Sequence, residues 1–135
     1  MGFALTSDEK RLLVATGSNN MVVLMDAVAN KVRRSLSVPG QAAGLLPSKD
    51  GRRVYASLRG SGELAVLDPQ MFLEIKRGPA GVAAQGLALD PTGEYLYVSA
   101  QDANKVIKLH LPDLQVEQEI ETQAKPGPMY VLRGR

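Results

Sequence analysis

Short apolar runs separated by polar turns follow one another along the whole chain. The series is clearest where apolar runs at 86–89, 95–99 and 105–109 alternate with turn-forming segments at 90–93 and 101–104. Runs of about four to eight residues bounded by Gly, Pro, Asn and Asp are typical of β-strands. No apolar period of about 3.6 residues continues long enough to indicate a helix. The pattern therefore predicts an all-β fold.

Glycine and proline mark the ends of these runs. Asp50-Gly51 and Thr92-Gly93 stand where a tight hairpin requires a positive φ, which glycine adopts without steric cost. The segment 22–31 offers a helical alternative, but its apolar run and the turn residues after it favour strand, turn, strand. Four prolines lie at or beside expected strand ends, where a missing N–H breaks no ladder: Pro47, Pro69, Pro91 and Pro112.

The pattern also repeats at a fixed interval. Gly2, Gly44 and Gly86 are spaced by 42 residues, and Asp26 and Asp68 are separated by the same interval. A period of about 40–45 residues with several strands in each unit is typical of β-propeller blades. A β-sandwich of short strands is the alternative fold, but sandwiches rarely repeat at a fixed period. The repeat therefore favours the propeller.

We expect a single domain over residues 1–135 with three four-stranded blades, at about 2–43, 44–85 and 86–128. Residues 129–132 are expected to form the first strand of a fourth blade. Closed propellers typically have about 4–8 blades, and an open array leaves an apolar sheet face uncovered at each end. The expectation is therefore an incomplete propeller. It would be completed by oligomerisation, most simply by a second copy, or by the blades of a longer parent protein.

Composition limits the classes of partner. The chain has 135 residues with 16 basic and 14 acidic side chains, for a net charge of +2. This charge is too weak to indicate nucleic-acid or membrane binding. The basic doublets Arg33-Arg34 and Arg52-Arg53 are interpreted as solvated strand edges and turn flanks. Cysteine is absent, which excludes disulfides and thiolate ligands. No run approaches the ~18 apolar residues of a membrane span, and no signal peptide is expected.

Three segments resemble the consensus of YVTN-type β-propeller repeats. Residues 25–32 resemble its strand-turn-strand unit, residues 97–100 stand where the namesake tetrapeptide falls, and residues 86–93 resemble the stretch that opens each unit. The resemblance extends from Gly2 to Leu132. It implies propeller blades, with surface-layer proteins, periplasmic binding propellers, lactonase-like enzymes, and quinoprotein or haem-binding propellers as relatives. It also favours a periplasmic or exported parent.

One departure from that family concerns its chemistry. Many members carry Pro-His just before the glycine that opens the inner strand, on the loop facing the central channel. This chain has Ala42-Ala43, Ala84-Gln85 and Gly127-Pro128 at those places. The resemblance therefore implies no channel-facing metal, haem or acid–base role for this chain, and we expect no cofactor and no metal site.

Loops on one propeller face are the best candidates for a binding site, because functional residues concentrate on loops held by a rigid scaffold. One group of loops joins each outer strand to the next inner strand, at 39–43, 78–85 and 124–128. The second joins the second strand of each unit to the third, at 17–20, 59–62 and 101–104. The polar side chains expected to reach a ligand there are Asn19, Asn20, Gln41, Arg59, Gln85, Asp102 and Asn104.

Other polar residues are interpreted as structural. His110 is the only histidine and is expected to make a local hydrogen bond in a turn. Asp26 and Asp68 are expected to cap the tight turns that follow them, and not to form a ring of carboxylates. No Gly-x-Ser-x-Gly elbow, Ser/His/Asp set, phosphate-binding glycine motif or finger-like metal spacing occurs. No catalytic residue is predicted.

Two functions from different classes remain open. The first is a non-enzymatic binding or scaffold propeller, which acts through one loop face and through assembly with a second copy or with additional blades. The second is a fragment of a periplasmic propeller enzyme, lactonase-like or of the quinoprotein or haem-binding type, with catalytic residues outside this chain. Further blades of the same plain kind would favour the first, and channel-facing histidines or a haem attachment motif would favour the second.

Overall fold

A computed structural model of the chain describes residues 2–81, 83–123, 126 and 129. The described residues form antiparallel β-sheets of four strands each, which we call blades 1, 2 and 3. Blade 1 contains β1 (Phe3–Leu5), β2 (Arg11–Ala15), β3 (Met21–Asp26) and β4 (Lys31–Ser37). Blade 2 contains β5 (Ala42–Pro47), β6 (Val54–Leu58), β7 (Glu63–Asp68) and β8 (Leu73–Pro79). Blade 3 contains β9 (Ala84–Leu89), β10 (Tyr95–Ala100), β11 (Lys105–His110) and β12 (Gln115–Glu121).

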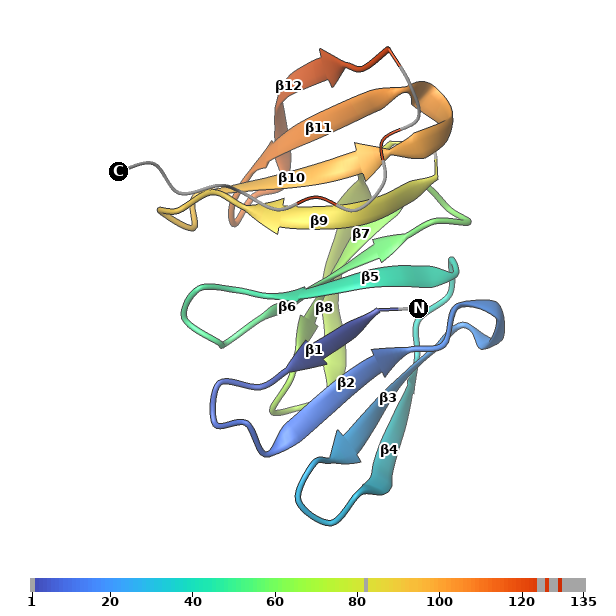
Figure 1. The fold of residues 1–135 in the computed structure, drawn as a ribbon, viewed down its shortest axis with the longest axis vertical. Coiled ribbons are helices and arrows are strands. Elements are labelled where there is room, and N and C mark those ends of the chain that lie inside the picture. Colours follow the sequence, from blue (N-terminus) through green and yellow to red (C-terminus); the bar gives the residue numbers. More distant parts are fainter. Residues whose placement is uncertain (1, 82, 124–125, 127–128, 130–135) are drawn as a thin grey trace.

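Each blade is a simple meander in which neighbouring strands pair in sequence order. The three sheets follow one another from the bottom to the top of Figure 1, and the inner strands β1, β5 and β9 run beside one another. This arrangement confirms the predicted all-β propeller blades. The predicted first strand of a fourth blade, at 129–132, lies outside the described residues except for Met129.

Local structure follows the turn chemistry of the sequence. Gly51 and Gly93 have φ values of 74° and 79°, as the tight hairpins require. Residues 22–31 form strand, turn, strand and not a helix. The only helical segments among the described residues are the 3₁₀ turns η1 (Gly17–Asn19) and η2 (Gln101–Ala103). No helix in this part of the chain has the length and apolar character that crossing a bilayer requires.

The inner strands begin slightly before the predicted blade boundaries. β5 begins at Ala42 and β9 at Ala84, whereas the glycine spacing placed the boundaries at residues 44 and 86. Ala42 pairs with Leu58, and Ala84 with Ala100, on the far side of a register shift in each inner pair. A β-bulge of this kind adds residues to one strand without ending the pairing. A boundary based on the glycine alone therefore misses the first two residues of the strand.

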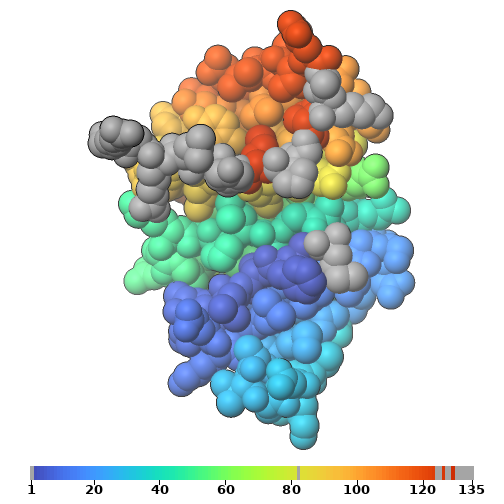
Figure 2. Space-filling model, in the orientation of Figure 1, coloured from blue at the N-terminus to red at the C-terminus, as the bar shows by residue number. Residues whose placement is uncertain are grey.

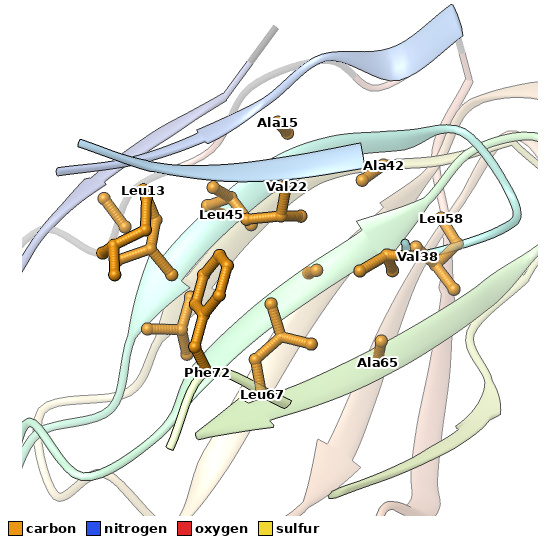
Figure 3. Packing of buried hydrophobic residues seen from close by; sticks show 14 residues of the cluster. Leu13, Ala15, Val22, Val38, Ala42, Leu45, Leu58, Ala65, Leu67 and Phe72 are labelled. Carbon is orange, nitrogen blue, oxygen red and sulfur yellow. The ribbon is translucent and has the colours of Figure 1, made fainter. Parts of the chain in front are cut away.

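The core lies between the blades. One cluster of buried side chains joins blade 1 to blade 2 and includes Leu13, Val22, Leu67 and Phe72. Figure 3 shows these side chains meeting between the two sheets. The second cluster joins blade 2 to blade 3 and includes Tyr55, Leu64, Leu96 and Ile107. Successive side chains of a strand point to opposite faces of the sheet, so blade 2 packs one face against blade 1 and the other against blade 3.

Candidate functional site

The predicted binding loops lie along one edge of the three sheets, which we call the loop edge. This edge carries the connections β2–β3, β4–β5, β6–β7, β8–β9 and β10–β11. The first two of these lie together at the right of Figure 1. Backbone hydrogen bonds join neighbouring connections: the N–H of Arg59 donates to the carbonyl of Gln41 at 3.0 Å, and that of Gln101 to Ala83 at 3.3 Å. The loop edge is therefore a connected backbone surface.

Asn20 holds two of these connections together. It ends η1 in a left-handed conformation with φ of 54°. Its side-chain Oδ1 accepts hydrogen bonds from the backbone N–H of Gln41 at 2.9 Å and of Gly40 at 3.3 Å. A short amide side chain tolerates this backbone conformation and bonds to nearby backbone groups. Asn20, predicted as a ligand contact, therefore has its carbonyl oxygen committed to the β4–β5 connection.

Asn104 occupies the same place in blade 3. It ends η2 with φ of 52°, and the equivalent residue of blade 2 is Gly62, with φ of 69°. The recurrence of Asn and Gly at this position is explained by the left-handed backbone, which other residues adopt at a steric cost. Asn104 and its neighbour Asp102 are both exposed, so both side chains lie at the surface of the loop edge.

Gln41 and Arg59 lie next to each other in space. Gln41 is exposed, has φ of 61°, and lays its side chain against Gly60, the residue after Arg59. Arg59 and Asn19 are also exposed. The structure thus brings Asn19, Asn20, Gln41 and Arg59 to one stretch of the loop edge between blades 1 and 2.

Gln85 lies apart from this stretch, on the inner strand β9. Its backbone carbonyl accepts a hydrogen bond from the Ser57 hydroxyl at 2.5 Å. Its side-chain Oε1 is buried and has no hydrogen-bond partner among the described residues. Gln85 also lines a hollow of about 220 Å³ between the inner strands, with glycine, alanine and leucine around it and Met129 at one side. Six of the seven predicted ligand contacts therefore lie at the loop edge, and Gln85 lies between the inner strands.

The residues interpreted as structural make the expected local contacts. His110 Nδ1 lies 2.9 Å from Asp113 Oδ1, and this hydrogen bond raises the pKa of His110 above its usual value. Asp26 Oδ1 accepts from the backbone N–H groups of Val28 and Ala29, both at 2.9 Å. The Ala29 N–H and the Arg33 guanidinium lower the pKa of the Asp26 carboxyl.

Asp68 repeats the arrangement of Asp26 in blade 2. Its Oδ1 accepts from the backbone N–H of Gln70 at 2.9 Å and of Met71 at 3.0 Å, and the Met71 bond is the main cause of a lowered pKa. Both aspartates cap the turn between the third and fourth strands of their blade. The predicted Asx turns are confirmed, because each carboxylate accepts hydrogen bonds from the backbone N–H groups of the turn that follows it.

Two polar arrangements were not expected from the sequence. Arg77 on β8 forms a two-point ion pair with Glu74, at 2.6 and 2.7 Å, and its Nη1 also bonds Glu63 and the Pro39 carbonyl. A hollow of about 570 Å³ lies between blades 2 and 3 at the edge opposite the loop edge. Its lining includes Lys49, Arg52 and Arg53. The Arg52-Arg53 doublet marks the blade 2 side of this hollow in the sequence. The sequence did not show that residues 92–94 of blade 3 lie opposite these arginines.

The described residues contain no group of three His, Cys, Asp or Glu side chains that could hold a metal ion. The predicted side chains give the loop edge amide groups, the Arg59 guanidinium and the Asp102 carboxylate, and the Arg77 guanidinium also reaches this edge at the Pro39 carbonyl. Amides neither titrate near neutral pH nor act as nucleophiles. The loop edge is therefore equipped for recognition of polar groups.

Comparison with known proteins places these blades in a family. A family model described as "Lactonase, 7-bladed beta-propeller" matches residues 25–131. No curated protein matches the sequence.

Solved structures resemble the fold at low sequence identity. Hydrazine synthase from Kuenenia stuttgartiensis superimposes with a TM-score of 0.86 at 23% identity, covering 94% of this chain and 37% of that one. AztD from Citrobacter koseri gives 0.80 at 12% identity, covering 98% and 38%. The dihydro-heme d1 dehydrogenase NirN gives 0.71 at 20% identity, covering 87% and 25%. The chain thus spans well under half of each, and identities this low show the fold alone.

Proposed function

The chain belongs to the family of seven-bladed β-propeller lactonases, and we propose that it is a non-enzymatic binding or scaffold module within that family. It binds a polar ligand or peptide along the loop edge and assembles with further propeller blades or with a second copy of itself. The family resemblance suggests a periplasmic or exported setting for this module.

The observation that carries the proposal is the chemistry of the loop edge. Asn19, Gln41, Arg59, Asp102 and Asn104 are all exposed there, and their amide, guanidinium and carboxylate groups donate and accept hydrogen bonds. The backbone beneath them is fixed by hydrogen bonds between connections. Side chains on a fixed backbone lose less conformational freedom on binding than side chains on a loose loop.

The experiment is a titration of the ¹⁵N-labelled chain, followed by amide chemical shifts. The panel contains neutral sugars, dicarboxylic acids and short peptides. Binding should move amide signals in residues 17–20, 39–43, 59–62 and 101–104. Arg59→Ala should weaken binding roughly tenfold, as expected for loss of a charged hydrogen bond.

The matched control is Arg52→Ala. Arg52 is also an exposed arginine, but it lies at the opposite edge of the blades, so its removal should leave affinity unchanged. Shifts confined to the opposite edge, or equal loss from both variants, would contradict a site at the loop edge.

The alternative is a fragment of a propeller enzyme, of the lactonase-like or the quinoprotein or haem-binding type, whose catalytic residues lie outside this chain. One observation favours it: the family is described by its lactonases. The sequence of further blades separates the two functions, because channel-facing histidines or a haem attachment motif there would favour the enzyme. A hydrolysis assay of this chain with a δ-lactone tests what both functions share, since the alternative places the catalytic residues elsewhere. The binding proposal predicts no turnover above the uncatalysed rate, and reproducible turnover by the chain itself would contradict both versions.

A further inference from the structure

A second candidate site lies at the edge opposite the loop edge, in the hollow of about 570 Å³ between blades 2 and 3. We call it the turn hollow, because the β5–β6, β9–β10 and β11–β12 turns border it. The first two of these turns lie on the same side of Figure 1, and the teal to green surface of blade 2 adjoins the yellow surface of blade 3 in Figure 2. The volume is within the range of pockets that hold small ligands.

Contacts between the turns hold the walls of the turn hollow in place. Lys49 Nζ donates a hydrogen bond to the Pro91 carbonyl at 3.0 Å. The Lys49 side chain also packs against Gly93, where an added Cβ atom would lie 3.1 Å from Lys49 Cβ. The N–H of Leu111 donates to the Glu94 carbonyl at 2.8 Å. A site whose walls are already fixed loses little conformational freedom when a ligand enters.

The Tyr55 hydroxyl is the feature that points to a ligand. Tyr55 is 7% exposed and belongs to the cluster between blades 2 and 3, yet its hydroxyl forms no hydrogen bond with any described residue. A tyrosine hydroxyl in a buried side chain usually has a partner. Burial raises the pKa of Tyr55, so the hydroxyl keeps its proton and can donate. Since Tyr55 lines the turn hollow, this hydroxyl is left to bond with water or with a ligand there.

Blade packing does not require this hydroxyl. Leu13 stands 42 residues before Tyr55, at the same place in blade 1, and it is fully buried without any polar group. By the same spacing, Arg52 is the blade 2 counterpart of Glu94. The corresponding turns of blades 1 and 2 border a smaller hollow of about 170 Å³. The turn hollow therefore differs from the junction of blades 1 and 2 in size, in its hydroxyl and in its charge.

The two walls of the turn hollow carry opposite charges. Blade 2 contributes the basic side chains of Lys49, Arg52 and Arg53, and blade 3 contributes the carboxylate of Glu94. Asp50 also lies on the blade 2 wall, but its Oδ1 already accepts two hydrogen bonds within its own turn, at 2.7 and 2.9 Å. A ligand with charges of both signs is therefore complementary to this hollow.

Two of these charged groups have no partner of their own. Arg53 lies 3.7 Å from the carboxylate of Asp68, and Lys49 donates to a backbone carbonyl. The guanidinium of Arg52 and the carboxylate of Glu94 form no hydrogen bond or ion pair with any described residue, and both residues are exposed. These two groups can bind a ligand without first breaking a contact.

We propose that the turn hollow binds a peptide that carries both an acidic and a basic side chain. The Arg52 guanidinium binds the peptide's carboxylate, which can accept two parallel hydrogen bonds from it. The Glu94 carboxylate binds the peptide's ammonium group, and the Tyr55 hydroxyl donates to a carbonyl of the peptide backbone. A peptide supplies all three partners in one molecule. The inference goes beyond the loop edge, because this site lies at the opposite edge of the blades.

The test is a titration of the ¹⁵N-labelled chain with the peptide acetyl-Asp-Gly-Lys amide, followed by amide chemical shifts. Binding should move the signals of residues 48–55 and 92–94. The peptide acetyl-Asp-Gly-Ala amide lacks the ammonium group and should bind roughly tenfold more weakly, as expected for loss of a charged hydrogen bond. Equal affinity for the two peptides, or shifts that spare both of these segments, would overturn the inference.

Tyr55→Phe separates a binding role of the hydroxyl from a structural one. It should weaken binding of the Asp-Gly-Lys peptide about three- to tenfold. It should leave the urea denaturation midpoint unchanged, because the hydroxyl has no partner within the described residues. Tyr97→Phe is the matched control, since Tyr97 is the blade 3 counterpart of Tyr55 and pairs with Lys108 on the sheet face that points away from blade 2. Unchanged peptide affinity of Tyr55→Phe would contradict the assigned role.

Glu94→Gln should affect the two peptides differently. The variant loses the partner of the ammonium group, so the Asp-Gly-Lys peptide should bind roughly tenfold more weakly. It also loses a charge that repels the peptide's carboxylate, so the Asp-Gly-Ala peptide should bind at least as tightly as it binds the unchanged chain. Arg52→Ala should weaken binding of both peptides. An equal loss for both peptides in Glu94→Gln would show that Glu94 does not select the ammonium group.

These outcomes are separable from those of the loop-edge titration, because the affinity of each site is read from its own amide signals. Arg52→Ala should weaken binding at the turn hollow alone, and Arg59→Ala should weaken binding at the loop edge alone. Peptide shifts confined to the loop edge would overturn the inference and leave the binding proposal standing. Shifts confined to residues 48–55 and 92–94 would contradict the loop-edge site and leave the inference standing.

Discussion

Gly44 on β5 and Gln85 on β9 approach so closely that a Cβ atom on Gly44 would lie 2.5 Å from the Gln85 carbonyl oxygen. Gly2 has the same relation to the carbonyl oxygen of Ala43. The inner strands of successive blades thus meet backbone to backbone at these glycines. The spacing of 42 residues between the glycines is therefore explained by blade packing, which leaves no room for a side chain.

Replacement of Gly44 by alanine should destabilise the chain. The Cβ would meet a backbone carbonyl that cannot move without shifting β9, and we expect a loss of about 1–3 kcal/mol in unfolding free energy. Urea denaturation measures it. Gly78→Ala is the matched control, because a Cβ there would lie 3.5 Å from Leu114 Cδ1, an ordinary contact. Equal stability of the two variants would show that the inner strands separate easily.

Replacement of Ser57 by alanine should weaken the contact between blades 2 and 3. The fully buried Ser57 hydroxyl accepts a hydrogen bond from Gly44 N–H at 2.8 Å and donates one to the Gln85 carbonyl at 2.5 Å. Removing it leaves both partners unsatisfied, which should lower the unfolding free energy by about 1–3 kcal/mol. Ser61→Ala at the exposed loop edge should change it by less than about 0.5 kcal/mol. A neutral Ser57→Ala would mean that the two backbone groups find other partners.

The His110–Asp113 pair should be visible in an NMR titration. The hydrogen bond from Asp113 is the main cause that raises the pKa of His110 above 6.5. The pair therefore adds stability below about pH 6.5, and this contribution is lost as pH rises through the folded-state pKa. Asp113→Asn should move the pKa of His110 downward. An unchanged titration curve would show that the pair does not persist in solution, and the single histidine makes the assignment direct.

The capping aspartates should give the opposite pH dependence. The Met71 N–H is the main cause that lowers the pKa of Asp68 below 3.8 in the folded chain. Its contribution is present above about pH 4 and is lost as pH falls through the lower, folded-state pKa. Asp68→Asn keeps an acceptor oxygen but cannot titrate, so its stability should fall less between neutral and acidic pH. Urea denaturation at pH 7 and near pH 3 tests this, and parallel losses in both proteins would contradict it.

The fold was largely predictable from the sequence, because its determinants are local and repeated. The alternation of apolar runs with Gly, Pro and Asp turns placed the strands, and the period of 42 residues placed the blades. The Asx turns at Asp26 and Asp68 and the local bond of His110 also followed, since each involves a partner within three residues. The first residues of β5 and β9 were missed, because a bulge interrupts their pairing.

The candidate site was less predictable, because it depends on which segments distant in the sequence meet. The sequence placed Asn20 and Gln85 together as ligand contacts, but the fold turns Asn20 toward the backbone of Gln41 and puts Gln85 between the inner strands. The residues themselves determine strands, turns and blades through short-range sterics and hydrogen bonding. Only the tertiary structure decides that Gly44 meets a carbonyl of the next blade. It also decides that Val66 of blade 2 is buried, whereas Lys108, at the equivalent position of blade 3, lies on the sheet face that points away from blade 2. Those relations arise from sheet packing, in which alternate residues of a strand face different neighbours.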